Sequence, residues 1–275
     1  MILIRIIQLI FRSFVDFFRD GGPMLAGSIS FFTMMAIVPF CLLLVTIFGY
    51  FLGENREFYH FFLSKLVSFF PKITSQITTE LGNIITHKGL GRLSLLLYGF
   101  LSYELFSSLE KAIHVTFKTK EGRSFFVSFI LSLVVITLII AFLLISFSAT
   151  SLMSMLKTLK EFFPRLQISE VTGFFIRFVI PLLLVQLNAM TLYLFLPKKR
   201  VKLFHAVSGA FFTAIFLEAA KHLFTLYVMN VVRLGTIYGP LSAFVIFLLW
   251  VFYSSCIFLV GAELVHNLGT SKKGR

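Results

Sequence analysis

A polar face interrupts the apolar stretch at residues 93–113. Its members are Glu104, Ser107, Ser108 and Lys111, and their spacing of three and four positions aligns them on one side of a helix. An apolar helical stretch of about 20 residues can cross a membrane. A charged side chain at the centre of a bilayer costs about 3 kcal/mol on insertion scales, so it is expected to have a polar partner or a functional role. If this polar track borders a cavity, Glu104 can take up and release a proton during a transport cycle. If it packs against another helix, it provides structural hydrogen bonds.

A second charged group lies within residues 203–232. Glu218 and Lys221 stand three positions apart there and can form an ion pair. Arg177, on the preceding apolar stretch, is expected at a similar depth. Either these residues line a polar pathway that also includes Glu104, or Arg177 and Lys221 extend their charged ends to the nearby membrane interface. The residue types leave both interpretations open.

Catalytic chemistry finds little support in this chain. The only two aspartates, Asp16 and Asp20, both lie near the N-terminus, and the six histidines show no metal-ligand spacing. Neither a Walker loop nor a Gly-x-Ser-x-Gly elbow is present. The sequence therefore predicts no catalytic residue, no metal site and no cofactor, and it ranks a membrane-embedded enzyme below transport and scaffolding.

The elements that position these residues are predicted to be membrane helices. Of all residues, 58% are hydrophobic and only 13% are charged, where a soluble domain carries about 25% charged residues. Three stretches, 21–53, 124–156 and 234–262, contain no charged side chain, and about 20 apolar helical residues suffice to cross a bilayer. Because the apolar runs do not alternate with polar residues as barrel strands do, the chain is predicted to be all-α.

Six transmembrane helices follow from these apolar stretches, in a single domain covering residues 1–275. The predicted spans cover residues 24–52, 93–113, 125–156, 174–196, 203–232 and 237–263.

The basic residues predict the orientation of the spans. The net charge of +13 comes from Lys and Arg placed between apolar runs, which argues for membrane topology and against nucleic-acid binding. The densest cluster is Lys198, Lys199, Arg200 and Lys202, between the fourth and fifth spans. Since cytoplasmic loops are enriched in Lys and Arg, both termini are predicted to lie in the cytoplasm.

Two segments outside the spans have amphipathic patterns. Residues 1–20 are predicted to form a helix in the inner membrane interface, with a polar stripe that faces water and anionic lipid headgroups. The stripe consists of Arg5, Gln8, Arg12, Asp16 and Arg19. The outer loop, residues 54–92, divides at Pro71 into two amphipathic helices. They either pack on the bundle or form a lid or a docking surface for a periplasmic or envelope protein.

Several motifs resemble the YihY/BrkB family of bacterial inner-membrane proteins. Near the first span the chain reads Ala26-Gly27-Ser28-Ile29-Ser30, followed by Pro39. After the second span it reads Leu109-Glu110-Lys111-Ala112-Ile113-His114. In and around the sixth span it reads Tyr238-Gly239-Pro240-Leu241, then Leu248-Leu249-Trp250, then Gly261-Ala262-Glu263-Leu264. The resemblance covers nearly the whole chain.

The resemblance implies a bacterial inner-membrane location and a connection with the cell envelope, including lipid or solute export. Members of the family have also carried the label ribonuclease BN. That label conflicts with this sequence, because a metal-dependent nuclease needs clustered carboxylates or histidines on a water-accessible face.

The leading functional hypothesis is a protein that transports a lipid-like or small solute for the cell envelope. The alternative is a non-catalytic scaffold whose outer loop docks a partner. A water-lined cavity that joins Glu104 to Glu218 would favour transport. A sealed bundle with an exposed apolar outer loop would favour scaffolding.

Overall fold

The computed structural model describes residues 2–36, 90–119, 126–131, 178–230 and 242–270. All regular secondary structure within these ranges is helical, which confirms the all-α prediction for this part of the chain. The labelled helices are α1 (Ile2–Arg19), α5 (Leu90–Thr116), α8 (Ile180–Phe195), α9 (Leu203–Asn230) and α11 (Ser242–Thr270). Two shorter helices cover Gly22–Ala36 and residues 126–131.

Helix α5 overlaps the predicted span 93–113, α8 the span 174–196, α9 the span 203–232 and α11 the span 237–263. Helix α11 continues to Thr270, seven residues beyond the predicted end of the sixth span at residue 263. Residues 37–52 of the first predicted span, most of the predicted span 125–156 and residues 54–89 of the outer loop lie outside the described residues.

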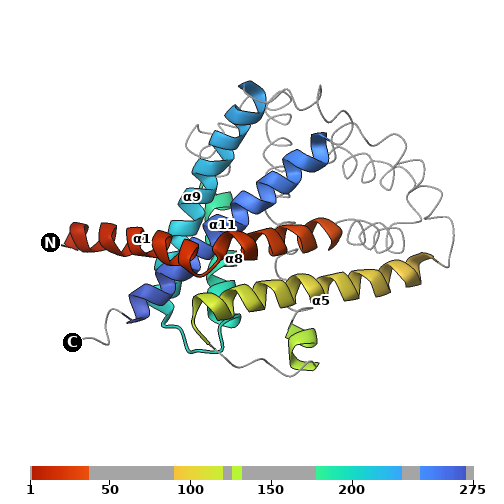
Figure 1. Cartoon of the computed structure of the whole chain (residues 1–275), viewed down its shortest axis with the longest axis horizontal. Coiled ribbons are helices and arrows are strands. Elements are labelled where there is room, and N and C mark those ends of the chain that lie inside the picture. The colour runs from red at the N-terminus through yellow and green to blue at the C-terminus, as the bar shows by residue number, and fades with distance from the viewer. Residues whose placement is uncertain (1, 37–89, 120–125, 132–177, 231–241, 271–275) are drawn as a thin grey trace, which may run out of the picture.

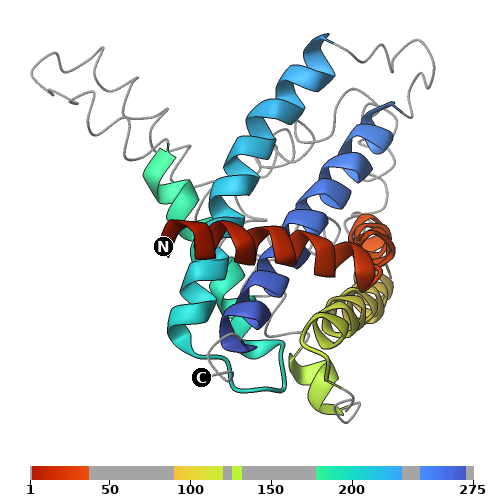
Figure 2. The ribbon, with the colours of Figure 1, turned by 60° about the vertical axis from the view of Figure 1, so that its left-hand side comes forward.

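Helix α11 is the centre of the described fold. It contacts α1, α5, α8 and α9. Figures 1 and 2 show α9 and α11 side by side, with α1 crossing them and Gly22–Ala36 running beside α5. Helix α8 packs on α9. Residues from both ends of the sequence therefore meet around a single helix.

Two of these helices have the length and composition of membrane spans. They are Leu203–Phe224 within α9 and Phe244–Thr270 within α11, and Gly22–Ala36 and Ile180–Phe195 are shorter apolar helices. Only 22% of the most apolar window of Phe244–Thr270 is buried, unlike the core helix of a soluble protein. Exposed apolar side chains such as Phe211, Phe244 and Leu249 suit lipid as the surrounding solvent.

Helices α9 and α11 approach closely because glycines stand at their crossing. A Cβ atom on Gly209 would overlap the Val265 side chain, and one on Gly261 would overlap the hydroxyls of Thr213 and Tyr193. Without a strong hydrophobic force between helices in lipid, small residues at a crossing permit the tight packing that holds helices together.

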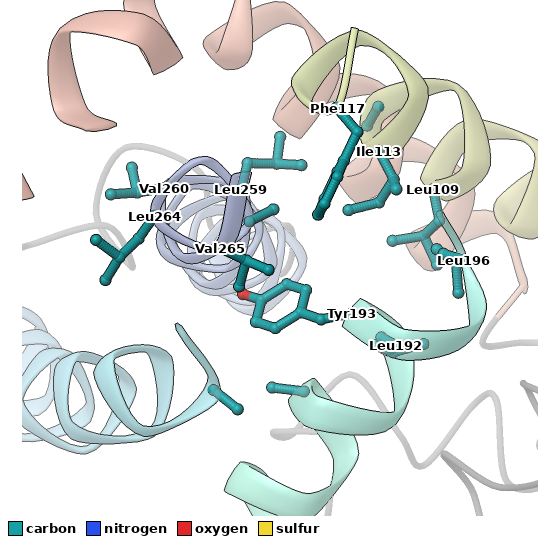
Figure 3. Packing of buried hydrophobic residues seen from close by; sticks show 14 of the residues in the cluster. Leu109, Ile113, Phe117, Leu192, Tyr193, Leu196, Leu259, Val260, Leu264 and Val265 are labelled. Atoms are coloured by element: carbon teal, nitrogen blue, oxygen red, sulfur yellow. The ribbon is translucent and has the colours of Figure 1, made fainter. Parts of the chain in front are cut away.

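Tyr193 connects α8 to this crossing. Figure 3 shows its ring extending from α8 toward α11, beside Val265. The ring stacks on Phe258, with centroids 4.9 Å apart, and the hydroxyl donates to the Phe258 carbonyl at 2.6 Å. The Thr213 hydroxyl lies 2.8 Å from the Tyr193 hydroxyl. The polar end of this fully buried side chain is thus paired, as burial requires.

A glycine turn sets the direction of α1. Gly21 has φ of 72°, a left-handed conformation that glycine adopts without steric cost. Gly22 follows, where a Cβ would overlap the Phe17 ring, and Pro23 stands at the start of the next helix. The turn directs α1 across α11 and Gly22–Ala36 along α5 (Figure 2).

Candidate functional site

Polar side chains gather where α1, the end of α5 and the last turns of α11 meet. Glu263 of α11 is at the centre and is only 1% exposed. The Thr116 hydroxyl from α5 is hydrogen-bonded to its carboxyl group, and Asp16, Asp20 and Lys118 lie close enough to act on it electrostatically. Oε2 of Glu263 has no hydrogen-bond partner among the described residues. This is a buried ionisable group within an apolar helix.

The α1 side of this junction is held by an amide. Asn267 donates from Nδ2 to the Asp16 carboxylate at 3.0 Å and to the Ser13 hydroxyl at 3.2 Å. Arg12 Nε lies 3.5 Å from the same Asp16 oxygen. Asp16 therefore points toward α11, with its side chain 14% exposed, although it belongs to the predicted water-facing stripe.

The α5 side is held by Lys118, whose ammonium lies 3.7 Å from Asp20 Oδ2. Lys118 has φ of 54°, a left-handed conformation uncommon for a residue with a side chain. It caps α5: the Thr119 amide donates back to the His114 carbonyl at 3.0 Å. The cap orients Lys118 toward the turn that carries Asp20.

The junction contains three carboxyl groups, Asp16, Asp20 and Glu263, and two fixed cations, Arg12 and Lys118. Asp16 and Asp20 each have a cation within 4 Å, whereas no described cation forms an ion pair with Glu263. Across the described ranges, no three His, Cys, Asp or Glu side chains come together to hold a metal ion. Among the described residues, Glu263 is therefore the acid of this junction that has no cation paired with it.

The predicted α5 track is divided in the structure. Ser108 is buried and its hydroxyl lies 2.8 Å from that of Ser28 on Gly22–Ala36, a helix-to-helix hydrogen bond. Lys111 is exposed, and Glu104 and Ser107 are half-buried. Neither Glu104 nor Ser107 has a hydrogen bond to another described residue. The apolar core positions of α5 lie on its other faces: Phe106, Leu109, Ala112 and Ile113.

The second predicted group forms the expected pair. Lys221 Nζ lies 2.5 Å from Glu218 Oε1, with the two side chains 49% and 25% exposed, and His222 Nε2 lies 3.5 Å from the same oxygen. Helix α11 lies between α9, which carries this pair, and α5, which carries Glu104 (Figure 2). Arg177 lies outside the described residues.

Outside the junction, residues of two other motifs make contacts that the structure describes. The Trp250 ring packs on Phe224 with centroids 5.3 Å apart, which joins α11 to α9. Glu110 accepts a hydrogen bond from the Ser128 hydroxyl at 3.1 Å and lies 3.6 Å from His114 Nε2. Pro39, Tyr238, Gly239 and Pro240 lie outside the described residues.

Sequence reasoning did not identify the junction, although two signals were present. Both aspartates of the chain lie within one short segment, and Glu263 belongs to the Gly-Ala-Glu motif. Neither signal reveals that Asp16 and Asn267 share a hydrogen bond, because a linear pattern carries no information about contacts between opposite ends of a chain.

The fold and this junction define a helical membrane protein whose central helix carries a buried carboxyl group, Glu263, beside other ionisable side chains. Residues 13–274 match the family described as virulence factor BrkB, and the chain belongs to this family, as its motifs suggested.

Several relatives carry the name UPF0761 membrane protein. One from Alteromonas mediterranea is 30% identical over 255 residues, which cover 91% of this chain and 84% of the relative. One from Vibrio parahaemolyticus is 30% identical over 252 residues, which cover 89% of this chain and 76% of the relative. One from Chlorobium limicola is 29% identical over 272 residues, covering 96% of this chain and 60% of the relative. No solved structure matches the chain.

Proposed function

We propose that this protein moves a lipid-like or small solute across or along the bacterial inner membrane, in support of the cell envelope. The observation that carries the proposal is Glu263, a carboxyl group buried within an apolar helix with one oxygen unpartnered among the described residues. Ionisable groups are costly in a membrane and are retained chiefly where they serve a pathway or a relay. The proposal involves no catalytic step, metal or cofactor.

The proposed topology has six spans and cytoplasmic termini, with α1 in the inner membrane interface. The exposed apolar side chains of α1 support its place at the interface, because they recur at helical spacing on one face. They are Ile4, Ile7, Phe11, Phe14 and Phe18. This face would enter the acyl-chain boundary while Gln8, Arg12 and Arg19 meet anionic headgroups.

Cysteine accessibility is expected to place the α8–α9 loop in the cytoplasm. In a background lacking Cys41 and Cys256, a cysteine at position 199 should react with a membrane-impermeant reagent only after the inner face is opened. A cysteine within 54–92 should react from outside, because that loop is predicted to be external. Reaction at position 199 in intact cells would contradict the topology.

Scaffolding is the second candidate, and one observation favours it. Helix α11 lies between the helices that carry Glu104 and Glu218, so a helix separates the two groups in the described part of the chain. Under this alternative, the protein would bind an envelope or periplasmic partner through residues 54–92.

Flux in proteoliposomes separates the two candidates. The full-length protein should move a phospholipid analogue or small solute faster than protein-free liposomes do. Glu104→Gln should reconstitute equally well yet reduce flux, because glutamine keeps the shape but cannot exchange a proton. Equal flux with and without protein would contradict the transport hypothesis and favour the scaffolding hypothesis. Wild-type flux in Glu104→Gln would assign Glu104 a structural role.

A further inference from the structure

A cavity of about 230 Å³ lies beside the polar junction, at the end of the bundle predicted to face the cytoplasm. Three segments distant in sequence enclose it: the end of α5, the loop between α8 and α9 with the start of α9, and the last turns of α11. Its wall includes Phe117, Lys199, Arg200, Lys202, His205 and Gly269.

The lining of this cavity is strongly basic. Lys199, Arg200 and Lys202 are consecutive or nearly so, and no acidic side chain pairs with any of them in the described part of the chain. His205 is buried, with 6% exposure, and His266 adds a second imidazole to the wall. The acids Asp16 and Asp20 act electrostatically on His266, as do the cations Lys118 and Lys199, and Glu263 lies three positions before it on α11. Asp16 and Asp20 have Arg12 and Lys118 as their cations, so the charges of the loop remain available for an anion.

The start of α9 adds a fixed electrostatic contribution. This 28-residue helix begins at Leu203, directly after the basic loop. The first amides of a helix lack intrahelical acceptors, and the helix dipole places partial positive charge at that end. The His205 and Ala206 amides already donate to the Lys202 carbonyl, at 2.9 and 3.2 Å. The basic side chains of the loop and the N-terminal end of α9 therefore both favour a negatively charged group in the cavity.

The dimensions and surroundings indicate which anion would bind. At about 230 Å³ the cavity is below the range of about 300–1,000 Å³ typical of sites for drug-sized ligands, so it suits a headgroup rather than an entire lipid. Arginine and lysine together match the several oxygens of a phosphate. Leu203 and Phe204 stand beside the cavity and are 60% and 73% exposed, where acyl chains could contact them.

We propose that this cavity binds a phosphate group, borne by a phospholipid headgroup or by free phosphate. Basic pockets between membrane helices on the cytoplasmic side recognise such headgroups. Binding at this site does not require transport, and a static binding measurement reports on it. A protein that binds phosphate but moves nothing would retain this inference and lose the proposed transport function.

Native mass spectrometry of the full-length, detergent-solubilised protein provides the test. Phosphatidic acid, phosphatidylglycerol and inorganic phosphate are titrated separately, with diacylglycerol of the same acyl chains as the phosphate-free control. Arg200→Gln should weaken binding of the phosphate-bearing ligand about tenfold or more, because a charge-assisted contact is lost. Gly269→Leu keeps every charge but should abolish binding, since the Gly269 Cβ direction leads toward His205 Nδ1, 3.7 Å away. Gly99→Leu, the matched control for Gly269→Leu, places the same side chain where nothing lies within 4 Å of a Cβ atom and should bind as the wild type does.

The outcomes divide clearly. Retention of phosphatidic acid or phosphatidylglycerol without diacylglycerol, lost in the two cavity variants, supports a lipid headgroup. Saturable binding of inorganic phosphate with the same variant pattern supports free phosphate. Equal retention of diacylglycerol and phosphatidic acid, with no binding of inorganic phosphate, overturns the proposal. Wild-type binding in either cavity variant also overturns the proposal. If one of the two variants cannot be purified in a folded state, binding by the other variant tests the proposal.

Discussion

Replacing Gly261 with valine should cause one of the largest losses of stability available to a single substitution in this chain. The new Cβ would overlap the hydroxyls of Thr213 and Tyr193, so α9 and α8 would have to move away from α11. Overpacking costs about 1–3 kcal/mol, and leaving the buried Tyr193 hydroxyl without its acceptor costs about 1–3 kcal/mol more. The melting temperature of the detergent-solubilised protein should fall clearly.

Gly99→Val is the matched control for this substitution. Both glycines lie inside helices, so the change in helix propensity is the same, but nothing lies within 4 Å of a Cβ at Gly99. The control should melt near the wild-type temperature. If both variants lose the same stability, the effect is a helix-propensity effect and the close α9–α11 crossing does not explain it.

Replacing Glu263 with glutamine should preserve the fold and abolish function. Glutamine keeps the shape of the side chain and can still bond to the Thr116 hydroxyl. It removes an ionisable group that is 1% exposed and lies near two other carboxylates, so the melting temperature should stay unchanged or rise. Flux in proteoliposomes, or rescue of an envelope phenotype, should be lost because the amide cannot exchange a proton.

Two further variants test the alternative that Glu263 is only structural. Glu263→Ala should lower the melting temperature, because it leaves a cavity and an unpaired Thr116 hydroxyl. Arg19→Gln removes an exposed charge at the end of α1 and should change stability much less. Full activity of Glu263→Gln, or its failure to fold, would assign Glu263 to structure.

The hydrophobic pattern predicted an all-α chain, and the described residues confirm it. The predicted stretch 203–232 corresponds to α9 (Leu203–Asn230), and the predicted N-terminal helix 1–20 to α1 (Ile2–Arg19). Helix formation and membrane solubility depend on residues within a few turns of each other, so they can be read from local composition and spacing. The Glu218–Lys221 pair was predictable for the same reason, since its members are three positions apart on one helix.

Only the tertiary structure decided which polar residues meet. The sequence drew attention first to Glu104, which has no hydrogen bond to another described residue, whereas the acids Asp16, Asp20 and Glu263 gather with Lys118 and Asn267. That meeting depends on the turn at Gly21 and on the α1–α11 crossing, which join residues from opposite ends of the chain. The basic cavity likewise needs the α8–α9 loop to lie against the ends of α5 and α11. The sequence by itself determined a helical membrane protein of the BrkB family, because those properties are local or are carried by linear motifs. The positions of its charges relative to one another came from helix packing, because contacts between distant segments leave no periodic pattern in the chain.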